Sequence, residues 1–249
     1  LSYRSSITVR GKHISLGSFS TEADAAKVYE EARQLISCAQ ITPDAYKDSY
    51  TLPYTKFISL VNYRDSGLYF PTPIYLRKNY FEYHLMPTEV LKFDRDDLFF
   101  YATHTIQKRG GYLFFSDYGS QYNLLSRYGI KSYAVYGRDY EMVNGDTHDY
   151  RYSNIRILNQ YIGVSMEDSS SDKPYITRIH VNGHMIVGRY ATEIDAAIAY
   201  NKAVDILHAN GLKRAYIKNY IMTFDKETYL SHYNALHISG HITSYRKPS

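Results

Sequence analysis

The chain has 249 residues, of which 44% are hydrophobic and 22% are charged, and its formal net charge is +4. This is the composition of a globular protein, so wholesale disorder is excluded. The single cysteine, Cys38, excludes an internal disulfide and a cysteine-based zinc finger and favours a reduced, intracellular setting. No apolar run is long enough to span a membrane, so we expect no membrane partner.

The first fifty residues predict two strands and a helix. Ser6–Arg10 and Ile14–Gly17 are strand-like segments joined by a turn at Gly11. Thr21 is a candidate N-cap for the helix that follows, because a threonine oxygen can accept from an unpaired amide of the first turn. Small and aromatic residues then recur at helical spacing, at Ala25, Ala26, Tyr29 and Ala32. A helix with such an alanine-lined face can pack closely against a sheet.

Residues 50–110 are rich in aromatic side chains and carry few recognisable motifs. Val90–Tyr101 fits either a strand or a helix, and the pattern leaves the choice open. Arg109–Phe115 predicts a turn that leads into a buried strand. Tyr122–Gly129 predicts a short helix that ends at its C-terminal glycine.

Residues 138–158 carry the most informative pattern of the central segment. Asn144-Gly145-Asp146 is followed by Asp149 and then by Ser153-Asn154-Ile155-Arg156. This spacing resembles the ββα-metal core of HNH homing endonucleases. In that family a histidine three residues before the glycine draws a proton from the water that attacks the phosphodiester, and an Asn or His beyond the motif supplies the last metal ligand.

The resemblance implies that the catalytic positions are degenerate. Met142 stands at the position of the histidine base, and its thioether cannot accept a proton at neutral pH. Gly163 stands near the position of the last metal ligand and has no side chain. Glu141 keeps oxygens that could hold a metal, and Asn154 could keep its role of tying the fold together. One carboxylate without a second ligand makes a poor Mg²⁺ site, so we expect no catalytic residue, no metal and no cofactor.

The central segment leaves an enzymatic alternative open. His148 with Asp146 and Asp149 could form a rearranged catalytic cluster, although a solvated loop histidine beside loop aspartates explains the same residues. The chain would then be an active HNH nicking or homing endonuclease that depends on Mg²⁺.

Residues 162–221 repeat the organisation of the N-terminal segment. Tyr175–Val181 and Met185–Gly188 predict two strands around Asn182-Gly183, which is the strongest short signal for a β-hairpin. Thr192 is the candidate N-cap of the next helix. Beyond this unit, residues 225–236 predict a helix in the tail.

The two end segments are copies of one unit. Residues 17–32 and 188–203 share Gly, Thr, Glu, Asp, Ala, Ala, Tyr and Ala at matching positions. Both copies resemble the Apetala-two (ethylene-response-factor) DNA-binding domain of plants, whose bacterial and phage relatives accompany homing endonucleases. The second copy keeps the opening Gly163-Val164 of that family, whereas the first starts at Leu1-Ser-Tyr and lacks it. The resemblance implies a three-stranded sheet that lies in the major groove of DNA, with the helix packed behind it.

Strand alternation then separates side chains that face DNA from those that face the helix. In the first copy the outward candidates are Arg4, Thr8, Arg10, His13 and Ser15, with Lys12 at the hairpin tip for a phosphate. In the second copy they are Ile176, Arg178, His180, His184 and Ile186, with Lys173 for a phosphate. Tyr175 is a further candidate for a DNA contact, because plant members carry Trp at the positions of Tyr175 and Ile186. The helix-facing candidates are Thr177, Ile179 and Val181. Arg10 and Arg178 are the candidates for bidentate contact with guanine, worth about 1–3 kcal/mol of base discrimination.

The sequence thus predicts an α+β protein with two small three-stranded antiparallel sheet-plus-helix modules around a central degenerate ββα domain. The expected segments are residues 1–50, 51–161 and 162–221, with a helical tail at 222–249. The expected function is sequence-specific binding of double-stranded DNA by a transcriptional regulator derived from an HNH homing endonuclease. We expect it to be cytoplasmic and nucleoid-associated in a bacterium or phage, and a homodimer is left open.

Overall fold

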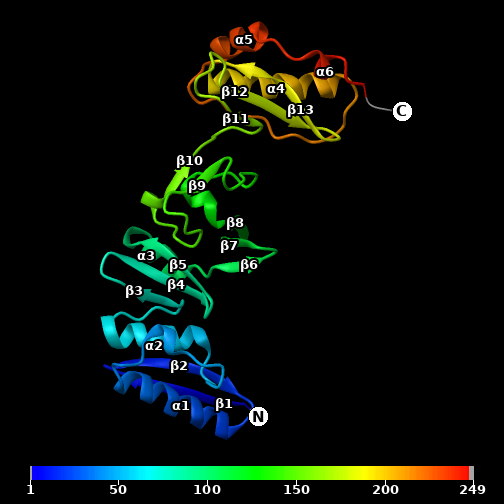
Figure 1. Cartoon of the computed structure of the whole chain (residues 1–249). Coiled ribbons are helices and arrows are strands. Elements are labelled where there is room, and N and C mark those ends of the chain that lie inside the picture. Colours follow the sequence, from blue (N-terminus) through cyan, green and yellow to red (C-terminus); the bar gives the residue numbers. More distant parts are fainter. Residues whose placement is uncertain (1, 247–249) are drawn as a thin grey trace. The chain divides into compact units, whose positions relative to one another are not determined.

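The computed structural model describes residues 2–246, and Figure 1 shows their course. The chain forms two compact units, one made of Leu1–Tyr128 with Met142–Ile155 and the other of Gly129–Glu141 with Arg156–Ser249. The described residues contain six α-helices and five small sheets of two or three strands, so the predicted α+β class is confirmed. None of the helices in this described part is both long and apolar enough to cross a membrane.

The first unit begins with a two-stranded antiparallel sheet, β1 (Tyr3–Val9) and β2 (Lys12–Phe19). Arg10 and Gly11 have φ angles of 49° and 78°, and a type I′ hairpin requires positive values at both central residues. No third strand joins this sheet within residues 2–246. The first copy therefore has two of the three strands of the predicted module, which agrees with the absence of the family's opening Gly-Val from its sequence.

Helices α1 (Glu22–Ser37) and α2 (Tyr54–Ser66) share one hydrophobic core with this sheet. A 3₁₀ turn at Pro43–Ala45 lies between the two helices. Leu52 and Phe57 are fully buried in the shared core. The core thus continues beyond residue 50, where a module boundary was expected.

The rest of the first unit has an aromatic core built from two antiparallel sheets and short helical segments. The strands are β3 (Ile74–Leu76), β4 (Tyr80–Met86), β5 (Glu89–Asp94), β6 (Gln107–Arg109), β7 (Tyr112–Asp117) and β8 (Ser120–Asn123). The helical segments are α3 (Leu98–Thr103) and the 3₁₀ turns Arg95–Asp97 and Leu124–Tyr128. In this core the ring centroids of Phe93 and Tyr101 lie 4.3 Å apart.

These elements test the predictions for the central segment. Val90–Tyr101 contains the end of β5 and the start of α3, so strand and helix each describe part of it. The predicted turn and strand at Arg109–Phe115 are confirmed by the β6–β7 hairpin, but the strand is not buried as expected, because Phe115 is its only buried residue. The helix predicted at Tyr122–Gly129 is confirmed in part: Tyr122 and Asn123 end β8, and Leu124–Tyr128 form a short 3₁₀-helix. Gly129 follows it with a φ of 73°, which is the left-handed conformation typical of a glycine that ends a helical turn.

Strands β9 (Tyr140–Met142) and β10 (Ile155–Ile157) form a two-stranded sheet, and a 3₁₀ turn at Tyr152–Asn154 precedes β10. The next element is strand β11 rather than a helix. The helix of the expected ββα domain is therefore absent from the described residues, because the chain beyond β10 leads directly into the C-terminal sheet.

The second unit is built around a three-stranded antiparallel sheet that one long helix covers on one face, as Figure 1 shows. The strands, in spatial order, are β11 (Val164–Met166), β12 (Tyr175–His180) and β13 (His184–Tyr190). The helices are α4 (Glu193–Ala209), α5 (Lys226–Ala235) and α6 (Gly240–Thr243). Helix α4 covers the sheet, and α5 and α6 pack against α4. The predicted hairpin, the long helix and the tail helix are confirmed.

Both long helices of the repeat begin with the same cap. The hydroxyl oxygen of Thr21 accepts from the Asp24 amide at 3.1 Å, and that of Thr192 accepts from the Asp195 amide at 3.0 Å. Each hydroxyl also donates to the aspartate carboxylate, at 2.7 and 2.8 Å. A cap of this kind stabilises a helix by about 1 kcal/mol, so the predicted N-caps are confirmed with their physical role.

The alanine face of α4 lets the helix lie close to the sheet. Ala196, Ala197 and Ala203 are fully buried, and the Thr177 hydroxyl of β12 donates to the carbonyl oxygen of Ala196 at 2.8 Å. Gly163, just before β11, lies so close to the helix that an added Cβ would meet the Tyr200 ring at 2.5 Å and also the Arg178 carbonyl oxygen. The strand therefore starts at a position that only glycine fits.

We expect Gly163→Ala to destabilise the protein more than Gly129→Ala. Both glycines have a φ of 73°, so both alanines suffer the same backbone strain. Only at Gly163 does the new methyl group also collide with a neighbour, because nothing lies within 4 Å of a Cβ at Gly129. The difference in unfolding free energy, measured by urea denaturation, should be about 1–3 kcal/mol. Equal values would show that Gly163 is not in close packing.

Candidate nucleic-acid interface

The face of the β11–β13 sheet turned away from α4 carries the candidate site. On the opposite face Thr177, Ile179 and Val181 are buried against the helix, as predicted. The side chains that alternate with them form what we call the outer face: Ser165, Glu167, Ile176, Arg178, His180, His184, Ile186 and Arg189. Strand pairing places Arg178 opposite Ile186, and His180 opposite His184.

Two arginines of the outer face meet on one carboxylate. Glu167 accepts from Nη2 of Arg178 and from Nη2 of Arg189, the latter at 2.6 Å. Nη1 of Arg178 also donates to the Ser165 hydroxyl at 3.3 Å. The two arginine side chains remain 35% and 48% exposed, so their guanidinium groups are held in place while open to solvent.

The hydrogen bonds from Arg178 and then Arg189 lower the pKa of the Glu167 carboxyl, since both favour its charged form. Because the carboxylate is at the surface, solvent and salt screen these ion pairs. The arrangement orients the two guanidinium groups more than it stabilises the fold.

Ile176 corrects the sequence prediction. It was expected to face DNA, and alternation does place it on the outer face, but it is fully buried. It lies on the central strand between Ser165 and Arg189, and the arginine side chains that meet on Glu167 share its face. Ile176 is therefore not available for a direct contact with DNA.

Tyr175 is a second correction. It was expected to contact DNA, but it alternates with Ile176 and packs against the core beneath α4. Of the residues predicted to contact DNA in this copy, His180, His184 and Ile186 on the outer face and Lys173 before β12 are exposed. Arg189 and Glu167 belong to the same surface, and sequence reasoning missed both. Pairing of β13 with β12 puts Arg189 opposite Ile176, which is the signal that could have revealed it.

The first copy presents less of its predicted surface. Arg4, Thr8, His13 and Ser15 are exposed, and Thr8 lies opposite His13 with 3.3 Å between the hydroxyl and Nδ1. These positions agree with the predicted outward orientation.

Arg10 and Lys12 lie differently from what was expected. Arg10 donates to the carbonyl oxygens of Tyr63 at 3.4 Å and Arg64 at 3.1 Å, at the C-terminal end of α2. The Tyr63 carbonyl oxygen also accepts from the Gly67 amide at 3.0 Å, so the Arg10 guanidinium adds a second donor where the helix ends. The ammonium nitrogen of Lys12 lies 5.3 Å from the centre of the Tyr69 ring. Both basic residues of the hairpin tip are thus engaged within their own unit.

The positions matched to the endonuclease pattern hold structural roles. The Glu141 carboxylate accepts from Arg156, and Met142 is 5% exposed. Asn154 ties the loop before it, because its amide donates to the carbonyl oxygen of Asp149 at 2.8 Å and its oxygen accepts from the Asn144 amide at 2.8 Å. This is the role that was expected of Asn154.

The alternative cluster around His148 is occupied by lysines. The His148 ring nitrogens lie 3.8 Å from Glu89 and 3.8 Å from Asp146. Lys108 and Lys92 already pair with these carboxylates, at 2.7 and 2.8 Å. Within residues 2–246, no three His, Cys, Asp or Glu side chains gather as they would around a metal ion.

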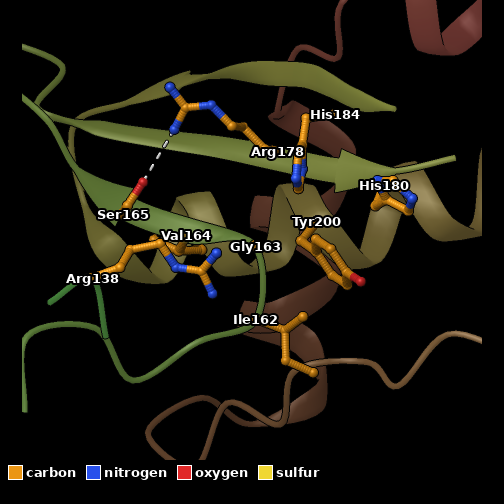
Figure 2. A pocket seen from close by; sticks show the side chains of 9 residues that line it. All are labelled: Arg138, Ile162, Gly163, Val164, Ser165, Arg178, His180, His184 and Tyr200. Carbon is orange, nitrogen blue, oxygen red and sulfur yellow. Dashed lines mark hydrogen bonds between the residues drawn. The ribbon is translucent and has the colours of Figure 1, made fainter. Parts of the chain in front are cut away.

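A cavity of about 380 Å³ lies beside the outer face, and Figure 2 shows the side chains around it. The lining residues are Arg138, Ile162, Gly163, Val164, Ser165, Arg178, His180, His184 and Tyr200. Arg138 was not found by sequence reasoning, because it lies far from the sheet in the chain and only the tertiary fold brings it here. Comparison of the chain with protein-family models, curated proteins and solved structures found no match.

We expect the pKa of Glu167 to rise when Arg178 and Arg189 are both replaced by glutamine. Loss of the two positive partners removes what favours the carboxylate, so protonation becomes easier. In the intact protein the ion pairs are complete above the lowered pKa and are lost as the pH falls through it. Carbon-detected NMR titration of the carboxyl groups measures both values.

Asp225 is the control for this titration, because hydrogen bonds from the Thr228 amide and side chain lower its pKa and neither arginine contributes to the shift. Its pKa should change little in the double variant. A Glu167 pKa that stays the same in that variant would contradict the ion-pair arrangement.

Proposed function

We propose that the protein binds double-stranded DNA sequence-specifically and that the outer face of the β11–β13 sheet enters the major groove. The observation that carries the proposal is the pair of arginines, Arg178 and Arg189, oriented by one carboxylate on a small exposed sheet. The major groove is wide enough for a two-stranded β-ribbon, and β-sheet readers of DNA use it in this way.

The outer face offers the chemistry that base recognition needs. A guanidinium group can donate two parallel hydrogen bonds to O6 and N7 of guanine, which is the commonest specific contact in the major groove. Ile186 on the edge strand β13 is 51% exposed, so its side chain can contact the methyl group of thymine. The exposed His180, His184 and Lys173 flank these residues and suit contacts to phosphate.

The biological role that we propose is transcriptional control in association with the nucleoid, in the cytoplasm of a bacterium or of a bacterium that carries the phage. Duplication of the unit and the resemblance of both copies to a DNA-binding domain support this role. The second copy supplies base recognition in this proposal. The first copy, with Arg4 and His13 exposed and Arg10 engaged by α2, contributes contacts to the backbone.

We expect Arg178→Ala to weaken sequence discrimination without unfolding the protein. The variant loses one bidentate contact, so its preference for a duplex selected from a random pool over an unrelated duplex should fall by about 1–3 kcal/mol, or roughly 5–150-fold. Fluorescence anisotropy at fixed salt measures both affinities, and thermal unfolding checks the fold.

Arg246→Ala is the matched control, since it removes one positive charge from the same unit beyond α6. It should lower both affinities slightly and leave their ratio unchanged. An unchanged ratio for Arg178→Ala would remove the outer face from base recognition.

A further inference from the structure

The cavity beside the outer face collects nitrogen-bearing side chains from separate parts of the second unit. Arg138 precedes β9, Arg178 and His180 lie on β12, and His184 begins β13. No Asp or Glu is among the described residues that line it. Asp139 and Glu167 pair with the two arginines from outside the lining, so the cavity suits an anion through its free hydrogen-bond donors and not through an excess of positive charge.

Hydrogen-bond donors remain available on three of these side chains. Nε and Nη2 of Arg138 donate to Asp139, at 3.0 and 2.6 Å, and Nη1 has no hydrogen-bond partner within residues 2–246. Asp139 is buried, so it fixes the Arg138 guanidinium in one orientation. The imidazole rings of His180 and His184 lie 5.1 Å apart, centre to centre, and neither ring has a hydrogen-bond partner in the described part of the chain.

The apolar wall of the cavity strengthens the hydrogen bonds that these donors can form. Val164 and Tyr200 are buried beside it, and Gly163 adds no side chain to the space. An apolar wall lowers the local dielectric constant, so a charge-assisted hydrogen bond counts for more here than on an open surface. The volume lies near the lower end of the range of about 300–1,000 Å³ that is usual for small-molecule sites, and it fits a phosphate group with its attached sugar.

We infer that this cavity binds a phosphate group, with Arg138, His180 and His184 as its donors. Its source under the proposed function is a phosphodiester of the DNA backbone, and this part of the inference rests on that function. Arg138 then fixes the position of the duplex without reading a base, whereas Arg178 reads one. The other source is a free phosphate or a small phosphoester.

The experiment uses the full chain and two probes, inorganic phosphate and duplex DNA. Phosphate should shift the NMR signals of the His180 and His184 rings in a saturable way. Arg138→Gln should weaken that binding at least tenfold. On the duplex, the same variant should lower the slope of log affinity against log salt by about 0.9, the value for one lost phosphate contact, and leave base preference unchanged.

Two further variants keep the result decisive. His184→Asn removes a ring whose nitrogens form no hydrogen bond within the described chain. It should therefore weaken phosphate binding even if Arg138→Gln fails to fold. Arg156→Gln removes an arginine of the same unit that pairs with Glu141 and does not line the cavity, so it should change neither readout.

The outcomes separate the two proposals. Phosphate binding that both variants weaken, without any DNA binding, would support the cavity and overturn the proposed function. DNA binding whose salt slope and affinity ignore Arg138→Gln and His184→Asn, with no ring shifts on addition of phosphate, would overturn the cavity and leave the function standing. Ring shifts that neither variant changes would also overturn the inference.

Discussion

The close approach of α4 to the C-terminal sheet determines which side chains of that sheet reach solvent. It depends on alanines along the helix and on Thr177, whose hydroxyl bonds the helix backbone from β12. Because one face of the strands packs against the helix, the side chains that alternate with it, including those of Arg178 and His180, point to the other face. Gly163 extends the same constraint to β11, because only a residue without a side chain fits between the strand and Tyr200. The orientation of the candidate site is therefore a consequence of helix packing.

The two copies of the unit share a sequence pattern but pack differently. Both begin their helix with the same threonine cap, yet the tyrosine that is 5% exposed in α4, Tyr200, has a counterpart in α1, Tyr29, that is 41% exposed. The difference follows from the sheets, since β11 covers its helix and the first copy has no such strand among the described residues. The first copy instead packs against α2, and Arg10 caps that helix. Under the proposed function, base recognition is therefore assigned to the second copy.

Local rules predicted the features that depend on neighbours in the chain. The N-caps, the hairpin and the burial of Thr177 follow from side-chain type and from alternation, and the structure confirms them. The sequence did not predict the features that depend on residues far away in the chain. Ile176 alternates outward but is fully buried, and Arg138 joins the cavity from a segment before β9. A period-2 pattern contains no information on either contact, because both are set by tertiary packing.

The measurement that tests the account most directly is a map of amide chemical-shift changes in the second unit when a duplex selected from a random pool is added to the full chain. We predict that the changes gather on β12 and β13 at the outer face, with Arg178 and Arg189 among the largest, and that Ala196 and its neighbours in α4 change little. Changes centred on the helices, or no changes at a duplex concentration that saturates binding, would contradict the claim that this sheet face reads DNA.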